Sequence, residues 1–468
     1  MSKNTEIELK LVVSKENLKK MLALDFVANA IRTDSRKKRK LVSSYYDTDD
    51  LILKKHGIAY RVRDKGDGTF EATVKTSRRN SAGLSERLEL NLPVEKEMAV
   101  LEGFKDLGLE YDLTELAPNG VEKLFKVIVE RTTYILDLDG AVAELAIDNG
   151  RISAGRARDK IEEVEIELLE GDQGVLLDFA ARLAAEVPMF VEKRSKFVRG
   201  LALRGIAADE EAVRPKISNN ESHTGFVFAL QQHCDALLDC QKALLAEELD
   251  EDVLKVIKKE LSYIHSLIAC VETVTEHPLK EAVEKQLGNW QQQVERCLNL
   301  VEMQEVWKKQ MEAESDLLAR NSLEKKLDSV YIEHLNRLVS MAYAGSLTSA
   351  VFSVISWIYG CKWENEEHVK AQNIAEKCLD KWMVSKKEAA TVQEKLVHVE
   401  NMLFLAKSMS GKFYTREAEN LKKNRRKLQE RVSLLVKKQL LLDLMDNSTS
   451  KVLYRDCGIM LGFFLAQK

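Results

Sequence analysis

The chain has 468 residues, of which 45% are hydrophobic and 31% are charged, and its formal net charge at pH 7 is −4. This composition is typical of a globular protein of two or three domains. The slightly acidic balance excludes the domain-wide basic excess that is typical of nucleic-acid binding. We therefore expect local groups of charged residues to carry the function.

The cysteines and the apolar stretches indicate the cellular compartment. All seven cysteines lie between Cys234 and Cys457, and none is part of a Cys-x-x-Cys pair. This distribution predicts reduced cysteines, without a disulfide framework or a zinc site. The stretches Val351–Tyr359 and Ile459–Leu465 are shorter than the ~18 residues of a membrane helix, and the first residues leave no room for a signal peptide. We expect a cytoplasmic protein that binds neither a membrane nor nucleic acid.

The first predicted element is a strand in which charged and apolar side chains alternate. In residues 6–13 this alternation places the charged side chains on one face of the strand and the apolar ones on the other. The charged face carries Glu6, Glu8 and Lys10. Similar runs follow at residues 60–63, 72–75, 87–91 and 163–167. A single strand of this kind usually belongs to an antiparallel sheet whose charged face is exposed to solvent. Several allow a second interpretation, in which the charged faces converge on a polar tunnel.

Turns and helices separate these strands up to about residue 204. Clusters of Gly, Asn and Asp predict turns at residues 65–68, 139–140 and 148–150. The pair Asp139-Gly140 between two apolar runs is a strong signal for a two-residue hairpin. Helical spacing predicts helices over residues 15–24, 95–107 and 173–186. With seven or eight strands, this part is predicted to be α+β, with an antiparallel sheet or barrel.

The second half of the sequence has a different pattern. Residues 205–222 are polar and are predicted to be a linker between a first domain, residues 1–204, and a second domain, residues 223–468. In the second domain apolar residues recur at helical spacing, as at Leu421 and Leu428. This spacing predicts an all-α bundle.

The charged faces of the predicted strands carry both signs. The cations are Lys10, Arg61, Arg63, Lys75, Arg87 and Arg131, and the anions are Glu6, Glu8, Glu89, Glu144, Asp148, Glu165 and Glu167. A dry core would leave many of these ions unpaired at a cost of several kcal/mol each, whereas a water-filled channel avoids that penalty. Such a channel suits a polyanion with Mg²⁺ or Mn²⁺, because these ions bind carboxylate and phosphate oxygens together. Arginine and lysine side chains would hold the remaining phosphate charge.

The order of the motifs resembles that of a known family. Glu6-x-Glu8-x-Lys10 is similar to the ExExK signature of the CYTH superfamily, the triphosphate tunnel metalloenzymes. The later motifs follow that family in order: Tyr45-Tyr46-Asp47-Thr48, residues 57–63, Thr73-Val74-Lys75, Arg87-x-Glu89, Arg131, residues 144–148, Glu163-x-Glu165-x-Glu167 and residues 195–200. This ordered series is far more specific than any one of its motifs.

This resemblance implies an eight-stranded antiparallel β-barrel tunnel with flanking helices, and it implies roles for the charged residues. The carboxylates on the metal side are Glu6, Glu8, Glu165 and Glu167, and Glu89, Glu144 and Asp148 are added from the same charged face. The residues of the phosphate clamp are Lys10, Arg61, Arg63, Lys75, Arg87, Arg131 and Lys196, with Lys193 as an addition.

The activity implied by the resemblance is metal-dependent hydrolysis of inorganic triphosphate to diphosphate and phosphate. The catalytic residues would be Glu6, Glu8, Lys75, Glu165 and Glu167, and either a second metal ion or a glutamate such as Glu165 or Glu167 would activate the attacking water. Thiamine triphosphatase and class IV adenylate cyclase activity remain as alternatives, since each must also grip a triphosphate. A further alternative is a non-catalytic polyphosphate-binding protein, although such a protein would gain affinity by losing the tunnel carboxylates.

The helical half resembles, with departures, the CHAD domain, a histidine-bearing helical bundle proposed to bind polyphosphate. The arrangement of the two halves is similar to that of bacterial CYTH-CHAD inorganic triphosphatases. In the comparable stretch, residues 252–259, Leu254 stands where that family has a histidine, and lysines replace arginines. The resemblance implies polyphosphate as a partner of the helical domain.

Overall fold

The computed structural model describes residues 5–81, 83–206, 217, 223–246, 250–311, 321–361, 370–409 and 415–466. The chain divides into two compact units. The first is Met1–Val213 with Val351–Ser356, and the second is Arg214–Ala350 with Trp357–Lys468. The predicted linker, residues 205–222, lies outside the described residues except for 205, 206 and 217, and its limits stay a prediction.

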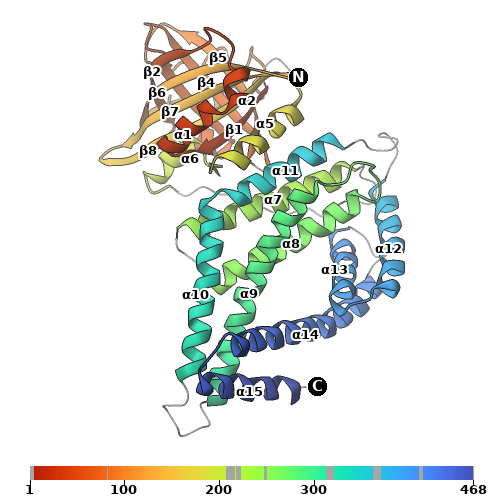
Figure 1. Cartoon of the computed structure of the whole chain (residues 1–468). Helices are drawn as coiled ribbons and strands as arrows, with labels where there is room; N and C mark the ends of the chain where they lie inside the picture. The colour runs from red at the N-terminus through yellow and green to blue at the C-terminus, as the bar shows by residue number, and fades with distance from the viewer. Residues whose placement is uncertain are drawn as a thin grey trace. The chain divides into compact units, whose positions relative to one another are not determined.

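An antiparallel sheet closes into a barrel in the first unit (Figure 1). Its strands are β1 (Thr5–Val12), β2 (Lys37–Asp47), β3 (Ile58–Asp64), β4 (Phe70–Ser81), β5 (Leu84–Val94), β6 (Glu122–Leu138), β7 (Ala141–Ala154) and β8 (Ala157–Gly171). The order around the barrel is β5-β4-β3-β2-β6-β7-β8-β1, and β1 pairs with β5 to close it. A two-residue strand, β9 (Phe190–Val191), also pairs with β1. The predicted eight-stranded antiparallel barrel is confirmed.

The apolar faces of the strands point outward and are covered by helices and loops. The helices of this unit are α1 (Lys15–Ala23), α2 (Asp25–Ala30), α3 (Ile52–Lys55), α4 (Leu113–Leu116), α5 (Gln173–Glu186) and α6 (Lys196–Ala202). Helix α5 packs against β7 and β8, and α3 packs against β2 and β3. On the side of β3 to β5, Tyr60, Val62 and Val74 are buried with Phe104 of the following loop. Because the apolar faces are used outside, the charged faces turn toward the interior.

The helix predicted over residues 95–107 is wrong. This segment is a series of bends and turns. Gly103 and Gly108 have φ angles of 89° and 102°, which end any regular helix. The hydroxyl of Tyr60 replaces helical bonding there, because it lies 2.8 Å from both the backbone oxygen and the backbone nitrogen of Val100.

The turn predicted at residues 148–150 is also wrong, because these residues lie inside β7. A Cβ atom on Gly150 would lie 2.0 Å from the backbone oxygen of Ile128 on β6. The glycine therefore allows two strands to approach closely and does not form a turn. The hairpin predicted at Asp139-Gly140 is confirmed, since β6 and β7 are joined there.

The second unit is helical, as predicted. Its helices are α7 (Thr224–Leu245), α8 (Glu251–Val271), α9 (Glu281–Met311), α10 (Asn321–Tyr343), α11 (Ser346–Gly360), α12 (Ala371–Glu388), α13 (Val392–Ser408), α14 (Thr415–Asp446) and α15 (Lys451–Ala466). All seven cysteines of the chain are buried, and no disulfide joins them. Among the helices described, no single one is both long and apolar enough to cross a membrane, and one pair bent by 56°, Ser322–Tyr343 with Ser346–Gly360, meets these criteria jointly.

The close approach at Gly150 gives a first prediction. We expect Gly150→Ala to destabilise the barrel by about 1–3 kcal/mol, because the new methyl group forces β6 and β7 apart. Hydrogen–deuterium exchange of peptides from these two strands measures the effect. The control is Gly288→Ala in α9, where a Cβ would meet nothing within 4 Å. That variant should gain about 0.5–1 kcal/mol. Unchanged exchange in β6 and β7 of Gly150→Ala would contradict this assignment.

Candidate functional site

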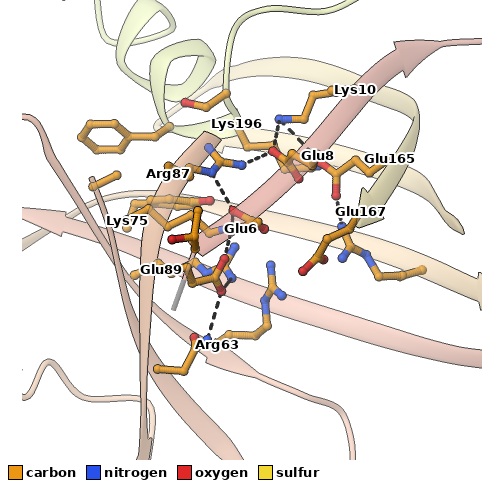
Figure 2. Close-up of a pocket in the computed structure, with 18 residues that line it drawn as sticks. Glu6, Glu8, Lys10, Arg63, Lys75, Arg87, Glu89, Glu165, Glu167 and Lys196 are labelled. Atoms are coloured by element: carbon orange, nitrogen blue, oxygen red, sulfur yellow. Dashed lines mark hydrogen bonds and ion pairs between the residues drawn. The ribbon is translucent and has the colours of Figure 1, made fainter. Parts of the chain in front are cut away.

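The interior of the barrel holds a polar cavity of about 300 Å³ (Figure 2). Seven cations and five carboxylates line it. The cations are Lys10, Arg61, Arg63, Lys75, Arg87, Arg131 and Lys196, and the carboxylates are Glu6, Glu8, Glu89, Glu165 and Glu167. Six strands and helix α6 contribute these side chains. The charged faces predicted from the alternation thus converge in the structure.

The register of the strands brings charges of both signs side by side. Residues directly opposite each other on neighbouring strands share one face of the sheet. Glu6 of β1 is opposite Arg87 of β5, and Lys75 of β4 is opposite Glu89 of β5. On the other side of β1, Lys10 is opposite Glu165 of β8. Closure of the barrel between β1 and β5 therefore completes the cavity wall.

One group of charges centres on Glu6. The ammonium of Lys75 donates to both carboxylate oxygens of Glu6, at 2.8 and 2.9 Å, and the Nε of Arg87 donates to it at 2.6 Å. The Lys75 ammonium also lies 2.5 Å from Glu89, and Arg87 pairs with Glu8. Lys10 lies 3.6 Å from Glu8 and Arg61 lies 3.6 Å from Glu89, so four cations contact these three carboxylates.

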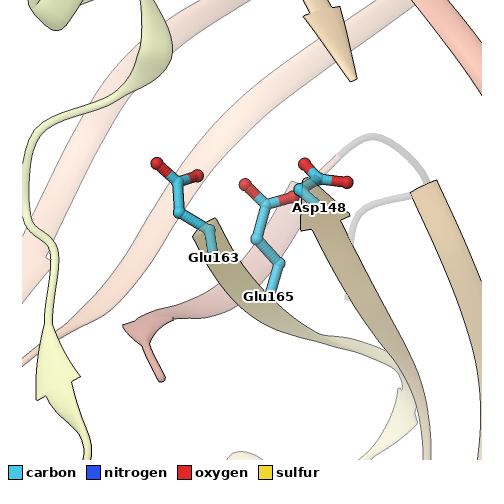
Figure 3. A group of neighbouring side chains, drawn as sticks. All are labelled: Asp148, Glu163 and Glu165. Atoms are coloured by element: carbon cyan, nitrogen blue, oxygen red, sulfur yellow. The ribbon is translucent and has the colours of Figure 1, made fainter. Parts of the chain in front are cut away.

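A second group centres on Lys196 of α6. Asp148, Glu163 and Glu165 are all buried, and their carboxylate oxygens lie within 4.8 Å of one another, close enough to hold a metal ion (Figure 3). However, the ammonium of Lys196 lies 2.9, 2.8 and 2.7 Å from these three carboxylates. It occupies the place that a metal ion would need.

Two arginines complete the charge balance of this second group. Arg131 binds Asp148 through two bonds of 2.7 Å and also binds Glu165 at 2.5 Å, and Arg199 pairs with Glu163. Burial by itself would raise the pKa of Glu165, but Lys196 and Arg131 hold it well below its ordinary value. Lys10 also lies 3.6 Å from Glu165, so four cations contact three carboxylates here, and we interpret this cluster as a structural one that fixes α6 to the barrel wall.

Glu167 differs from the other carboxylates of the cavity in its surroundings. Within the described chain it forms no ion pair. Burial and the negative charge of Glu6, with smaller contributions from Glu89 and Glu8, raise the pKa of Glu167 to about 8. A divalent cation among Glu6, Glu8, Glu89 and Glu167 would remove this repulsion, and carboxylate oxygens are the donors that Mg²⁺ and Mn²⁺ prefer. The residues present therefore fit a metal ion on this side of the cavity.

Arg63 carries positive charge that is left over, and Arg61 has one carboxylate, Glu89, at 3.6 Å. Arg63 donates its Nε to Ser43 at 2.9 Å and makes no ion pair with any described residue. Burial and the nearby charges of Arg61 and Arg131 lower the pKa of Arg63 to about 10. The buried Nε of Arg61 has no hydrogen-bond partner, although unsatisfied buried donors cost about 1–3 kcal/mol. These two guanidinium groups are therefore ready to bind an anion.

The phenol of Tyr45 responds to the same excess of positive charge. Burial would raise the pKa of its hydroxyl, but Arg61, Arg63, Lys196 and Lys75 lower it below the ordinary value. The cavity thus has a carboxyl group without an ion pair at Glu167 and positive charge in excess around Arg63.

The structure brings twelve of the fifteen predicted site residues to the cavity wall. The other three lie elsewhere. Asp148 is fully buried behind the wall, in the cluster around Lys196. Glu144 is opposite Glu167 on β7 but does not line the cavity, and Lys193 follows β9, also outside the cavity lining. The roles of all fifteen residues stay predictions.

Several residues that line the cavity were not predicted as site residues, among them Tyr45, Asn91 and Phe197. Asn91 could have been found by extending the alternation of Arg87 and Glu89 by one step. Tyr45 lies in a quoted motif, but nothing in that motif shows that its ring lines a cavity. Phe197 follows Lys196 on a short helix, where alternation does not apply.

The raised pKa of Glu167 predicts how stability depends on pH. Between pH 4.5 and 8 the folded protein holds a proton on Glu167 that the unfolded chain releases, so the stability of the metal-free protein falls as the pH rises through this window. Glu167→Gln cannot ionise. We expect it to match wild type near pH 4.5 and to be more stable by about 2–4 kcal/mol at pH 9. Calorimetric unfolding in EDTA measures the difference, and an equal difference at both pH values would refute the charge assignment.

Comparisons with known proteins agree with this geometry. Residues 4–201 match the CYTH domain. An inorganic triphosphatase from Haemophilus influenzae is 32% identical over 164 residues, which are 35% of this chain and 46% of that relative. The match therefore spans less than half the length of the relative.

Two solved structures are also similar to parts of the chain. A candidate adenylyl cyclase from Hippeastrum, described by its dominant triphosphatase activity, is 18% identical with a TM-score of 0.29, covering 44% of this chain and 99% of that one. The CHAD domain from the plant Ricinus communis is 12% identical with a TM-score of 0.44, covering 56% of this chain and 91% of that one. On the sequence match and the order of its motifs, residues 4–201 of this chain form a CYTH domain.

Proposed function

We propose that the barrel cavity hydrolyses inorganic triphosphate to diphosphate and phosphate with Mg²⁺ or Mn²⁺. The observation that carries this proposal is that one cavity holds a carboxyl group, Glu167, and a guanidinium group, Arg63, neither of which makes an ion pair with the residues that the structure describes. A triphosphate with a divalent cation supplies the missing charge to both at once. The inorganic triphosphatase from Haemophilus influenzae supports the proposal by similarity.

The cavity residues divide into two tasks in this proposal. Glu6, Glu8 and Glu89 hold the metal ion, which neutralises phosphate charge when bound. Arg61 and Arg63 bind phosphate oxygens and position the terminal phosphorus for attack. Phosphoryl transfer requires mainly such positioning and charge stabilisation from a protein.

Glu167 is the better proton acceptor of the two glutamates predicted to activate water. Glu165 lies within 4 Å of Lys10 and Lys196 and binds Arg131, and these cations hold its pKa well below the ordinary value. Glu167 makes no ion pair with the residues that the structure describes, so its carboxylate is the one left to accept a proton from water. Water attacks the terminal phosphorus, its proton passes to Glu167, and the bond to the diphosphate oxygen breaks.

The aromatic residues of the cavity favour an inorganic substrate over a nucleotide or thiamine triphosphate. Tyr45 and Phe197 are the aromatic side chains among the described lining residues. Tyr45 stacks on Phe125 with ring centroids 4.8 Å apart and on Phe197 at 5.8 Å. Their faces are therefore used within the protein, and a base or thiazolium ring would gain little by stacking there.

Arg63→Ala tests the proposed phosphate contact. Because Arg63 makes no ion pair, its removal leaves no buried carboxylate unpaired, and we expect a folded protein. The kcat/KM for inorganic triphosphate should fall about 10²–10³-fold, as is usual when one charge-stabilising donor is lost. The control is Arg158→Ala, since Arg158 is exposed and binds only backbone oxygens.

The assay measures phosphate release from inorganic triphosphate, ATP and thiamine triphosphate, with Mg²⁺, with Mn²⁺ and with EDTA. We expect inorganic triphosphate to be the preferred substrate and EDTA to abolish its hydrolysis. Metal-independent hydrolysis, or near wild-type turnover by Arg63→Ala, would exclude the proposed site.

We also propose that the helical unit binds polyphosphate. A pocket of about 210 Å³ there is lined by residues of α8, α13 and α14. Its cations are Lys255, Lys258, Lys259, Lys407 and Arg425. Burial and the charges of Arg425 and Lys422 lower the pKa of Lys407, so positive charge is in excess here too. Leu254, at the position of the family's histidine, is fully buried, so lysines would carry the binding.

Lys259→Ala/Lys407→Ala tests this second site. Loss of two cations should weaken binding of polyphosphate by about tenfold or more at low salt, because such binding is mainly electrostatic. Isothermal titration calorimetry measures the affinity. The control is Lys377→Ala/Lys381→Ala on α12, which removes two exposed lysines outside the pocket. Equal affinities of the two double variants would show that the pocket is not the binding site.

A further inference from the structure

Five consecutive basic residues, Arg36-Lys37-Lys38-Arg39-Lys40, lie at the start of β2. All five side chains are exposed. They do not line the cavity described above. A basic run of this kind is usually a solvated surface. The question is whether the fold places some of these side chains on the face of β2 that lines the cavity.

The register of β2 divides the run between two faces. Ser43 accepts a hydrogen bond from the cavity residue Arg63, and Tyr45 lines the cavity. The pairing of β2 with β6 is regular from Lys37 to Tyr45. Because side chains alternate along a strand, Lys37 and Arg39 share the inner face with Ser43 and Tyr45. We call Lys37 and Arg39 the rim pair.

The rim pair continues the cavity wall toward solvent. Arg39 is directly opposite Arg131 in the pairing of β2 with β6, and Arg131 lines the cavity. Such opposite residues have Cβ atoms about 5 Å apart. Lys37 lies two residues further out and contributes to the electrostatic environment of Glu144, which is itself opposite Glu167. On β2 the buried Leu41 lies between Ser43 and Arg39 on this face, so the cationic part of the inner face consists of Arg131, Arg39 and Lys37.

Little of the charge on the rim pair is compensated. Arg39 lies 3.7 Å from Asp67, and both side chains are about half exposed, at 50% and 45%. An exposed pair at this distance contributes little. Lys37 forms no ion pair with the residues that the structure describes. On the outer face, by contrast, Lys38 lies 3.1 Å from Glu130.

We propose that the rim pair binds the phosphate units of inorganic polyphosphate that extend beyond the terminal three. This inference rests on the proposed function, in which the cavity holds a triphosphate end. A longer chain with its end in the cavity carries one further negative charge out along the wall with each phosphate unit. The guanidinium of Arg39 and the ammonium of Lys37 suit such oxygens. A nucleoside or thiamine group would bring no negative charge to this place.

The test compares two double variants of one strand. Lys37→Ala/Arg39→Ala removes the rim pair, and Lys38→Ala/Lys40→Ala removes two positive charges from the outer face. The kcat/KM is measured for inorganic triphosphate and for inorganic tetraphosphate. We expect the rim variant to lose about tenfold or more on tetraphosphate, as for a lost bond between charged groups, and to stay within about twofold of wild type on triphosphate. The outer variant should leave both values within about twofold.

The possible outcomes separate the two proposals. If the rim variant lost kcat/KM equally on both substrates, the rim pair would only attract anions in general, and the inference would be overturned. Equal losses of the rim and outer variants would overturn it as well, and so would a wild-type protein that cleaves triphosphate but not tetraphosphate. A wild-type protein that cleaves neither substrate would instead reject the proposed function of the cavity.

Discussion

The cost of placing twelve charged side chains inside one barrel is the constraint on which the rest of this structure depends. An ion buried without a partner costs several kcal/mol, so the interior must pair its charges or stay open to water. Cross-strand pairs such as Lys75 with Glu6 meet most of this requirement. The apolar faces then have to be covered from outside, which α5 and the loop around Phe104 do. The places where the pairing is incomplete indicate where a ligand would bind.

The ion pairs distinguish two acidic groups that the distances between carboxylates alone do not distinguish. Asp148, Glu163 and Glu165 are close enough together for a metal ion. They are nevertheless neutralised, because Lys196 contacts all three. Glu167 makes no ion pair with the residues that the structure describes, and burial and the nearby charge of Glu6 raise its pKa. Distances between carboxylates favour the first group as a metal site, whereas the ion pairs and the raised pKa favour the second.

Much of the cavity could be predicted from the sequence because a strand has a period of two residues. Alternation placed Arg61, Arg63 and Glu89 on the charged face without knowledge of the partner strands. Alternation also placed Asp148 on the correct face, but it could not predict that Asp148 is fully buried or which cations contact it. Those depend on barrel closure and on Lys196 of α6, which are contacts between distant parts of the chain. The turn predicted at residues 148–150 is wrong because glycine occurs both in turns and where two strands approach closely, as at Gly150.

The chain is acidic overall, yet each of its two units has a pocket with excess positive charge. The net charge of −4 would favour neutral or acidic pockets if charge were spread evenly. In the barrel, an unpaired Arg63 lowers stability, and a neutral side chain there would avoid that cost. In the helical unit, the crowded cations around Lys407 repel one another in the same way. An anion with several charges would relieve such local repulsion, and for this reason we propose phosphate chains as the ligands of both pockets.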